Sequence, residues 1–409
     1  MITRRHLLET AGAGAALAVS GLSLPKFMAA EAAGADLTPG VPQGISSYVT
    51  MGTLPGKKPL IQLSDRPPNY EAPIEYLRTP ITPNDQFYVR YHLADIPEVK
   101  AEGYKISVGG DGANGTAEIT LDDLKKMPAV EVVAVNQCSG SRRGLSKPHV
   151  TGVEWGYGAM GCARWKGARL KDVLDKVGLK KEAIEISFNG ADGPAIDKTP
   201  DFIKSIPVWK ATDEATIIAY EMNGAPLPHF NGFPARIIVP GWTGTYWMKH
   251  VITINALTKP QGGFWMNPAD RVPLGKFPLR DRFTTQEYAP NTPITEMVVN
   301  SLITSHRDGA QVKAGKVAVS GMAWDGGYGI RAVEVSTDGG KNWSTASLGQ
   351  DLGPYAFRPW SFDLSAKRGK NTVMVNATNK IGQSQTAELI FNPAGYHNNV
   401  MQNISLVGA

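Results

Sequence analysis

Residues 131–144 read EVVAVNQCSGSRRG, so a run of β-branched residues leads into a loop of small and basic residues. The run at 131–135 is typical of a strand, which we expect to open into a turn at Cys138. Positive charge from Arg142 and Arg143 favours the thiolate, the form of cysteine that binds metals. Arginine also suits oxyanions, through forked hydrogen bonds. The segment therefore predicts a strand end that presents a metal-binding sulfur beside an anion site.

Strand and helix patterns alternate around this segment up to about residue 290. Further strands are expected at residues 86–91, 184–188, 216–220 and 236–239. A short amphipathic helix is expected at residues 170–177, because its leucines and valines recur at three- and four-residue spacing. This mixture predicts an α+β domain over residues 76–290.

After about residue 291 only strand and turn patterns remain. Strands are expected at residues 317–322, 330–336, 360–364 and 371–379. Asp338-Gly339-Gly340 is typical of a tight turn between strands, and Trp324 and Trp360 supply large core side chains. These patterns predict an immunoglobulin-like β-sandwich over residues 291–409.

The N-terminal segment has the pattern of a targeting signal. Arg4 and Arg5 precede an Ala- and Gly-rich stretch, and small residues near position 30 suit a cleavage site. Residues 1–30 therefore predict a twin-arginine signal peptide and export to the periplasm, by a route that carries folded proteins with an inserted cofactor. The apolar stretch is too short and too glycine-rich to span a bilayer, so no membrane anchor is expected. Residues 31–75, with many prolines and glycines, are expected to form an extended arm on the main domain.

Bulk composition narrows the function classes. The chain has 409 residues, which exceeds one ordinary domain, and a formal net charge of +5. No long Lys/Arg run follows the leader, so a nucleic-acid partner has no support. Two cysteines in an exported protein could form one disulfide. The setting of Cys138 favours metal binding instead, and Cys162 is expected to be a buried structural cysteine.

Two other segments place basic groups where an anion could bind. In a strand Arg90 and His92 lie on one face, where they repel each other unless an anion or carboxylate lies between them. The alternative is a solvated strand face. A proline- and glycine-rich loop presents Asn231 and Arg236, and a following loop offers backbone amides and Lys249. Such a loop could bind a phosphate through its backbone amides and the lysine.

Together these segments resemble the sulfite oxidase family of molybdenum enzymes, from about residue 80 to the C-terminus. The resemblance implies that Cys138 ligates molybdenum beside the dithiolene of molybdopterin. It also implies that Arg90 and Arg143 bind the anionic substrate, with His92 beside them and Trp155 at the pocket wall. The expected cofactor contacts are Phe87, Tyr88, Arg90, His92, Cys138, Asn231, Arg236, Trp247 and Lys249. The second domain resembles the dimerisation domain of the family.

Within the family, the segments look most like bacterial periplasmic sulfite dehydrogenases, which pass electrons to a c-type cytochrome. No b-type haem domain precedes the molybdenum domain and no C-x-x-C-H motif occurs, so we expect no haem in this chain and a separate cytochrome as acceptor or subunit. A homodimer and a heterodimer with a haem subunit both stay open.

One position departs from the family pattern. Relatives usually carry an active-site tyrosine where this sequence places Asp270. A carboxylate beside an anionic substrate weakens binding unless it takes a proton or pairs with a cation such as Arg271 or a pocket arginine. The departure keeps two alternatives with the same cofactor, a sulfane-sulfur dehydrogenase and a methionine sulfoxide reductase. A non-catalytic exported protein that retains the fold is the alternative from another class.

Overall fold

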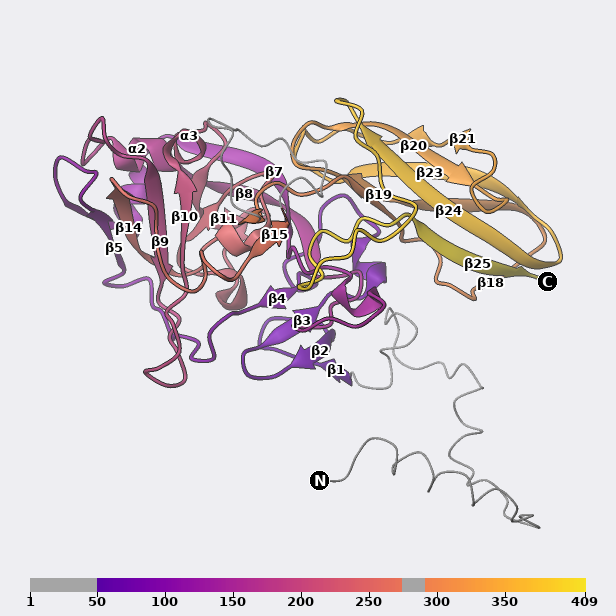
Figure 1. The fold of residues 1–409 in the computed structure, drawn as a ribbon, viewed down its shortest axis with the longest axis horizontal. Coiled ribbons are helices and arrows are strands. Elements are labelled where there is room, and N and C mark those ends of the chain that lie inside the picture. The colour runs from indigo at the N-terminus through magenta and orange to yellow at the C-terminus, as the bar shows by residue number, and fades with distance from the viewer. Residues whose placement is uncertain (1–49, 274–290) are drawn as a thin grey trace, which may run out of the picture. The chain divides into compact units, whose positions relative to one another are not determined.

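The structure is a computed structural model that describes residues 50–273 and 291–409. The predicted signal peptide, residues 1–30, lies outside the described residues. Strands dominate both domains (Figure 1). The three α-helices described are short: α1 (Leu121–Lys126), α2 (Leu170–Leu174) and α3 (Val208–Ala211). None of the described helices is long and apolar enough to cross a bilayer.

Two sheets form the first domain around a shared hydrophobic core. One sheet has the order β10 (Ile203–Pro207), β9 (Glu185–Gly190), β14 (Val251–Leu257), β5 (Lys105–Gly109) and β6 (Ala117–Thr120). The other has the order β12 (Ala225–Pro226), β11 (Ile217–Met222), β8 (Met160–Arg169) and β7 (Ala129–Gln137), and β13 (Arg236–Ile238) also pairs with β11. Trp165 and Ile254 are among the fully buried residues of this core. The α+β prediction is confirmed.

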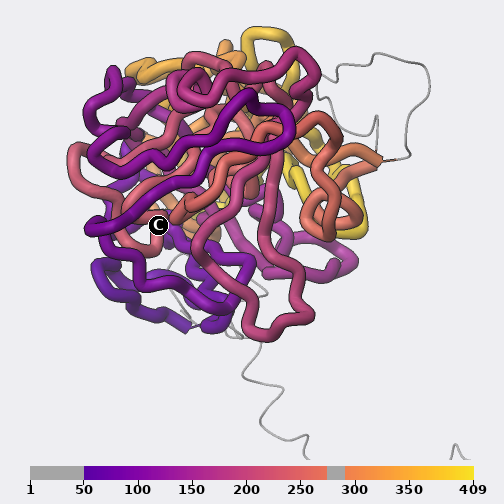
Figure 2. Tube along the Cα trace, turned by 90° about the vertical axis from the view of Figure 1, so that its left-hand side faces the viewer, coloured from indigo at the N-terminus to yellow at the C-terminus, as the bar shows by residue number. Residues whose placement is uncertain are grey.

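Local sequence explains where several of these elements begin and end. Thr120 caps α1 in a capping box with Asp123, in which each side chain bonds the backbone of the other residue. The expected helix at 170–177 forms but ends at Leu174. The loop between β9 and β10 projects from the sheets in two perpendicular views (Figures 1 and 2), and its base brings Asp192 and Phe202 to the functional pocket described below.

The described part of the predicted N-terminal arm is a small antiparallel sheet. The arm contributes three strands, β1 (Thr50–Gly52), β2 (Leu60–Ser64) and β3 (Asn69–Glu71). The fourth strand of this sheet, β4 (Val89–Arg90), belongs to the first domain. The arm is therefore paired through β4 with the first domain, because Asn69 and Tyr70 lie opposite Arg90 and Val89. The strand expected at residues 86–91 shortens to the two residues of β4.

The second domain is a sandwich of two sheets, as predicted. One has the order β17 (Asn300–Ile303), β19 (Gly315–Trp324), β23 (Arg358–Ala366) and β22 (Ser347–Leu348). The other has the order β18 (Gln311–Val312), β25 (Gln402–Gly408), β24 (Gly369–Asn379), β20 (Ile330–Ser336) and β21 (Ser344–Thr345). Buried side chains from both sheets, including Val319, Trp360 and Leu406, form one core. A hairpin of β15 (Arg271–Pro273) and β16 (Asn291–Pro293) precedes the sandwich.

The two domains share a buried contact at β7. Val135 and Cys162 pack in one apolar cluster with Trp324 and Phe357 of the second domain. The indole of Trp324 also donates to the side-chain oxygen of Gln137, at 2.8 Å. The end of β7 is therefore fixed from both domains.

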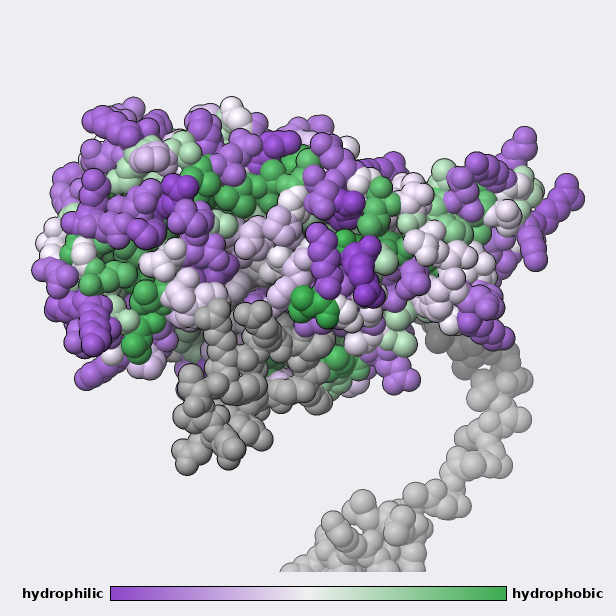
Figure 3. Space-filling model, turned by 90° about the horizontal axis from the view of Figure 1, so that it is seen from above, coloured by the Kyte–Doolittle hydropathy of each residue, from purple (hydrophilic) through white to green (hydrophobic). Residues whose placement is uncertain are grey.

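On the face seen in Figure 3, hydrophobic side chains are interspersed among hydrophilic ones.

A buried carboxylate ties the N-terminal sheet to the loop that follows the Cys138 segment. Glu71 accepts hydrogen bonds from the backbone nitrogens of Gly156 (2.6 Å) and Gly158 (2.8 Å). Burial raises the pKa of Glu71 from 4.5 to about 7, against the opposing effect of these backbone donors. Its folded-state pKa is thus above its unfolded value. The contribution of Glu71 to stability is therefore fully present below pH 4.5 and is lost as the pH rises through 7.

We expect this loss to be visible as a pH-dependent thermal midpoint. Between pH 4.5 and 7 the midpoint of the wild-type protein should fall further than that of Glu71→Gln, because glutamine does not titrate. Differential scanning calorimetry across this range measures the difference. Glu131→Gln is the control, since Glu131 belongs to an exposed ion pair with Arg164. Parallel pH profiles for the wild type and Glu71→Gln would contradict the assignment.

Candidate active site

One pocket of the first domain opens where β7 ends. The pocket gathers every expected site residue except Trp155. These residues are Phe87, Tyr88, Arg90, His92, Cys138, Arg143, Asn231, Arg236, Trp247, Lys249 and Asp270. Segments that are far apart in the sequence therefore meet in one cavity.

Cys138 follows the last residue of β7 and lies at the pocket wall. Its backbone nitrogen donates to the carbonyl of Ala159 at 3.0 Å, and its carbonyl accepts from the nitrogen of Ser141 at 2.9 Å. Both cysteines are free, so the disulfide alternative does not hold in this structure. Burial raises the pKa of Cys162 to about 12, which makes this second thiol inert. The accessible thiol is therefore that of Cys138.

The two adjacent arginines of the loop point in different directions. Arg142 has a left-handed backbone (φ 68°), and its buried guanidinium donates to the carbonyls of Val400 (2.7 Å) and Ser301 (2.9 Å) in the second domain. Arg143 lines the pocket and donates from Nε to the carbonyl of Ala394 at 2.7 Å. The left-handed backbone at Arg142 thus directs its side chain to the second domain, while the side chain of Arg143 faces the pocket. Of the two arginines, Arg143 is the one that lines the pocket.

Arg90 and His92 both line the pocket, although the strand ends at Arg90 and His92 lies beyond it. Arg90 Nη1 donates to Asn69 Oδ1 at 3.2 Å, and its buried Nε has no hydrogen-bond partner among the described residues. The His92 ring stacks on Phe202 with 3.8 Å between centroids. Burial, and then the positive charge of Arg90 and neighbouring cations, hold the pKa of His92 well below its usual value. His92 is therefore neutral at neutral pH and can accept or donate a hydrogen bond.

A cluster of buried cations surrounds Asn231 at the far end of the pocket. Arg236 donates to the carbonyls of Asn231 (2.8 Å) and Trp247 (2.9 Å), and Lys249 donates to the carbonyl of Arg90 at 2.7 Å. Burial lowers the pKa of Lys249 well below its usual value, and the negative charge of Asp192 opposes this shift only in part. Burial also lowers the pKa of Arg236 to about 10. An anionic group bound here would relieve this mutual repulsion.

Sequence analysis missed a member of this cluster. Lys57, on the N-terminal sheet segment, donates to the carbonyl of Asn84 at 2.6 Å and to the side-chain oxygen of Asn231. Burial lowers the pKa of Lys57 to about 7, with a raising effect of Asp85 and a lowering effect of Arg236. Nothing in the local sequence around Lys57 marks it, because it reaches the site only through the pairing of β1 to β4.

Trp155 does not lie at the pocket wall, where it was expected. It is fully buried, and its ring meets that of Tyr88 edge-on with 6.3 Å between centroids. Tyr88 lines the pocket and donates to the side-chain oxygen of Asn136. Trp155 therefore supports a wall residue instead of touching the cavity. The expectation failed because an apolar aromatic near the site can pack one layer behind it.

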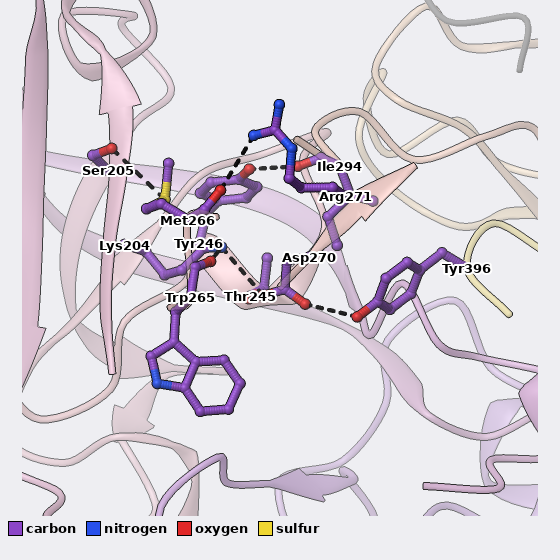
Figure 4. A network of polar contacts seen from close by, with 10 residues as sticks. All are labelled: Lys204, Ser205, Thr245, Tyr246, Trp265, Met266, Asp270, Arg271, Ile294 and Tyr396. Atoms are coloured by element: carbon purple, nitrogen blue, oxygen red, sulfur yellow. Dashed lines mark hydrogen bonds and ion pairs between the residues drawn. The ribbon is translucent and has the colours of Figure 1, made fainter. Parts of the chain in front are cut away.

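Asp270 lies at the pocket edge, but its partner is not the one expected from sequence. Its Oδ2 accepts from Lys204 Nζ (3.2 Å) and Thr245 Oγ1 (2.8 Å), and its Oδ1 accepts from Tyr396 Oη at 3.0 Å (Figure 4). Arg271 instead bonds Asn291 and the carbonyl of Met266. Lys204 is distant in sequence and Tyr396 belongs to the second domain, so neither could be found from the neighbourhood of Asp270.

The donors of the pocket fit a metal cofactor that carries negative charge. The pocket offers one thiol, several cations, and buried nitrogens of Arg90 and Arg236 that have no partner in the described part of the chain. Among the described residues no group of three His, Cys, Asp or Glu side chains could hold a metal ion. This lining fits an anionic cofactor, because the cations and the unpartnered nitrogens can donate hydrogen bonds to it.

Comparison with known proteins agrees with this chemistry. Residues 92–265 match the family model of the oxidoreductase molybdopterin binding domain, and residues 291–407 match that of the Mo-co oxidoreductase dimerisation domain. The chain is 34% identical over 351 residues to sulfite oxidase of Arabidopsis thaliana, covering 82% of this chain and 86% of the relative. It is 35% identical over 334 residues to mitochondrial sulfite oxidase of Homo sapiens, covering 78% of this chain but 60% of the relative.

A solved structure has the same fold. The sulfane dehydrogenase SoxCD from Paracoccus pantotrophus superposes with a TM-score of 0.73 at 23% identity, covering 90% of each chain. At this identity the likeness concerns the fold alone. The family models and the sequence relatives carry the assignment. The chain belongs to the sulfite oxidase family of molybdopterin enzymes, with a molybdopterin-binding domain followed by a dimerisation domain.

Proposed function

We propose that this protein oxidises sulfite to sulfate with a molybdenum–molybdopterin cofactor whose metal is ligated by Cys138. One observation carries the proposal: a free thiol and two arginines, Arg90 and Arg143, line the same pocket beside a cluster of buried cations. The sulfite oxidases among the sequence relatives support the substrate class.

Each part of the pocket has a distinct task in this proposal. Lys57, Arg236 and Lys249 would hold the anionic end of the pterin, because they are cations confined around Asn231. Cys138 would hold the metal. The bound cofactor supplies the two-electron oxidation, in which water provides the oxygen added to sulfite and two protons and two electrons leave.

Arg90 and Arg143 would orient the substrate and neutralise its charge. Both are guanidinium groups, which match the oxygens of an oxyanion through paired hydrogen bonds. Arg143 is held by the carbonyls of Ala394 and Val153, so its direction is fixed before substrate binds. This fixed charge requires no rearrangement during the reaction. Neutral His92 adds a polar contact without adding positive charge.

The electron acceptor and location follow from the resemblance to bacterial relatives. We propose a c-type cytochrome as acceptor, bound transiently or as a subunit, and a periplasmic location after export through the twin-arginine leader. The match of the second domain to a dimerisation domain supports association with a second chain, either a copy of this one or a haem subunit. Reduction of cytochrome c by sulfite, compared with thiosulfate, tests the first alternative, and reduction of methionine sulfoxide with an added electron donor tests the second.

Replacing Cys138 tests the metal ligand directly. Cys138→Ser should lower kcat/KM for sulfite by more than about 100-fold, the upper range for loss of outer-sphere partners of a metal, because it removes a direct ligand. The thiolate-to-metal absorption band should vanish as well. Cys162→Ala is the matched control, since that thiol is buried away from the pocket. Retained turnover and absorption in Cys138→Ser would refute the proposal.

The cation cluster predicts a separate effect on cofactor retention. Lys57→Met should be purified with several-fold less pterin per protein, because one of the charges around Asn231 is gone. Fluorescence of the oxidised, released pterin measures this content. Lys58→Met is the control, because Lys58 forms an exposed ion pair with Asp85. Equal pterin content in the two variants would remove Lys57 from the cofactor site.

A further inference from the structure

A turn of the second domain closes the pocket and holds the Cys138 loop. The backbone nitrogen of His397 donates to the carbonyl of Ser139 at 3.0 Å, and Arg143 donates to the carbonyl of Ala394. Gly395 has φ +62°, and a Cβ there would lie 2.6 Å from Val150 and 2.9 Å from Arg143. The turn therefore fits this loop closely. Its side chain that reaches the pocket is Tyr396.

The hydroxyl group of Tyr396 has one proton, and its surroundings decide where that proton points. Oη lies 3.0 Å from Asp270 Oδ1, and an ionised carboxylate can only accept hydrogen bonds. Asp270 also forms a buried ion pair with Lys204, whose side chain is 1% exposed. Burial, and then the charge of Asp270, raise the pKa of Tyr396, so the phenol keeps its proton. The phenolic proton of Tyr396 therefore points toward Asp270 (Figure 4).

A phenol that donates to Asp270 presents only its oxygen lone pairs to the pocket. That oxygen can accept a hydrogen bond from a ligand and cannot donate one. It repels an oxyanion without protons and favours an anion that carries a proton on oxygen or sulfur. The Arg143 guanidinium, 5.1 Å from the centre of the Tyr396 ring, keeps this side of the pocket positive. The guanidinium of Arg143 would therefore recognise the charge of a bound anion, and the phenol oxygen of Tyr396 would recognise its proton.

We propose that Tyr396 is a specificity-determining residue that selects a proton-bearing anion, and that Asp270 is the positioning residue that sets its hydrogen-bond direction. This inference rests on the proposed function. It implies that the substrate enters as hydrogensulfite, not as the sulfite dianion, so its oxidation to sulfate releases three protons with the two electrons. It also assigns part of the substrate site to the second domain.

Two anions that the cofactor does not oxidise provide the test. At about pH 8.5 phosphate is a dianion that keeps one proton, since its titration near neutral pH is complete, whereas sulfate is a dianion without one. The two match in charge and shape. Calorimetric titration of the purified holoenzyme should give hydrogenphosphate a Kd about five-fold lower than that of sulfate, as expected for one hydrogen bond.

Two variants should change this ratio in a defined way. Tyr396→Phe removes the acceptor, so the preference for hydrogenphosphate should disappear. In Asp270→Asn the amide oxygen must face Lys204 and Thr245, because an ammonium only donates. The amide nitrogen then faces Tyr396 and donates to it, which turns the phenolic proton toward the pocket. Sulfate should then bind at least as tightly as hydrogenphosphate. The charge change in this variant affects both dianions alike and cancels in the ratio.

Tyr328→Phe is the matched control, because Tyr328 also donates to a carboxylate, that of Glu296 at 2.9 Å, outside this pocket. Its ratio should equal that of the wild type. A ratio near one in the wild-type enzyme, or a ratio that stays constant in Asp270→Asn, would overturn the inference even if Tyr396→Phe does not fold. Absent sulfite turnover with the anion preference intact would count against the proposed function alone.

Discussion

Positively charged side chains gather around one pocket, and their charge determines which ligands the pocket can bind. Four cations line it, namely Arg90, Arg143, Arg236 and Lys249, and Lys57 is tied to it through a hydrogen bond to Asn231. Moving an ion out of water costs on the order of several kcal/mol even after relaxation. In the described residues around the pocket, Asp192 and Asp270 supply negative charge, and Asp270 is already paired with Lys204. A site with this charge balance is completed by anions, and both the pterin cofactor and a sulfur oxyanion are anions.

The fold tolerates these cations because it offers them neutral acceptors. Arg236, Lys249 and Arg143 all donate to backbone carbonyls. A carbonyl satisfies a donor and fixes its direction without cancelling its charge. Each cation is therefore oriented by the protein, while its charge stays available to a ligand. A carboxylate in direct contact with each cation would weaken the binding of anions to the pocket.

Much of the site could be predicted from sequence, because its chemistry lies in short continuous motifs. The strand before Cys138, the spacing of Arg90 and His92, and the loops that carry Arg236 and Lys249 are each set by local patterns. The two-domain α+β and sandwich architecture followed from the same patterns. Contacts made through tertiary structure could not be found this way. Lys57 arrives by strand pairing, and Tyr396 arrives from the second domain, 258 positions after Cys138 in a chain of 409 residues.

Asp270 shows why a residue's chemistry depends on its partners more than on its type. From sequence alone it is a negative charge where a tyrosine is usual, and it suggests weak anion binding. In the structure both its oxygens are occupied, by Lys204 and Thr245 on one side and by Tyr396 on the other (Figure 4). Its charge is compensated before any ligand arrives. The phenol of Tyr396, from the second domain, lines the pocket and donates its proton to Asp270. In our proposal the second domain would act on substrate binding, because a turn between its strands completes the polar wall of the pocket.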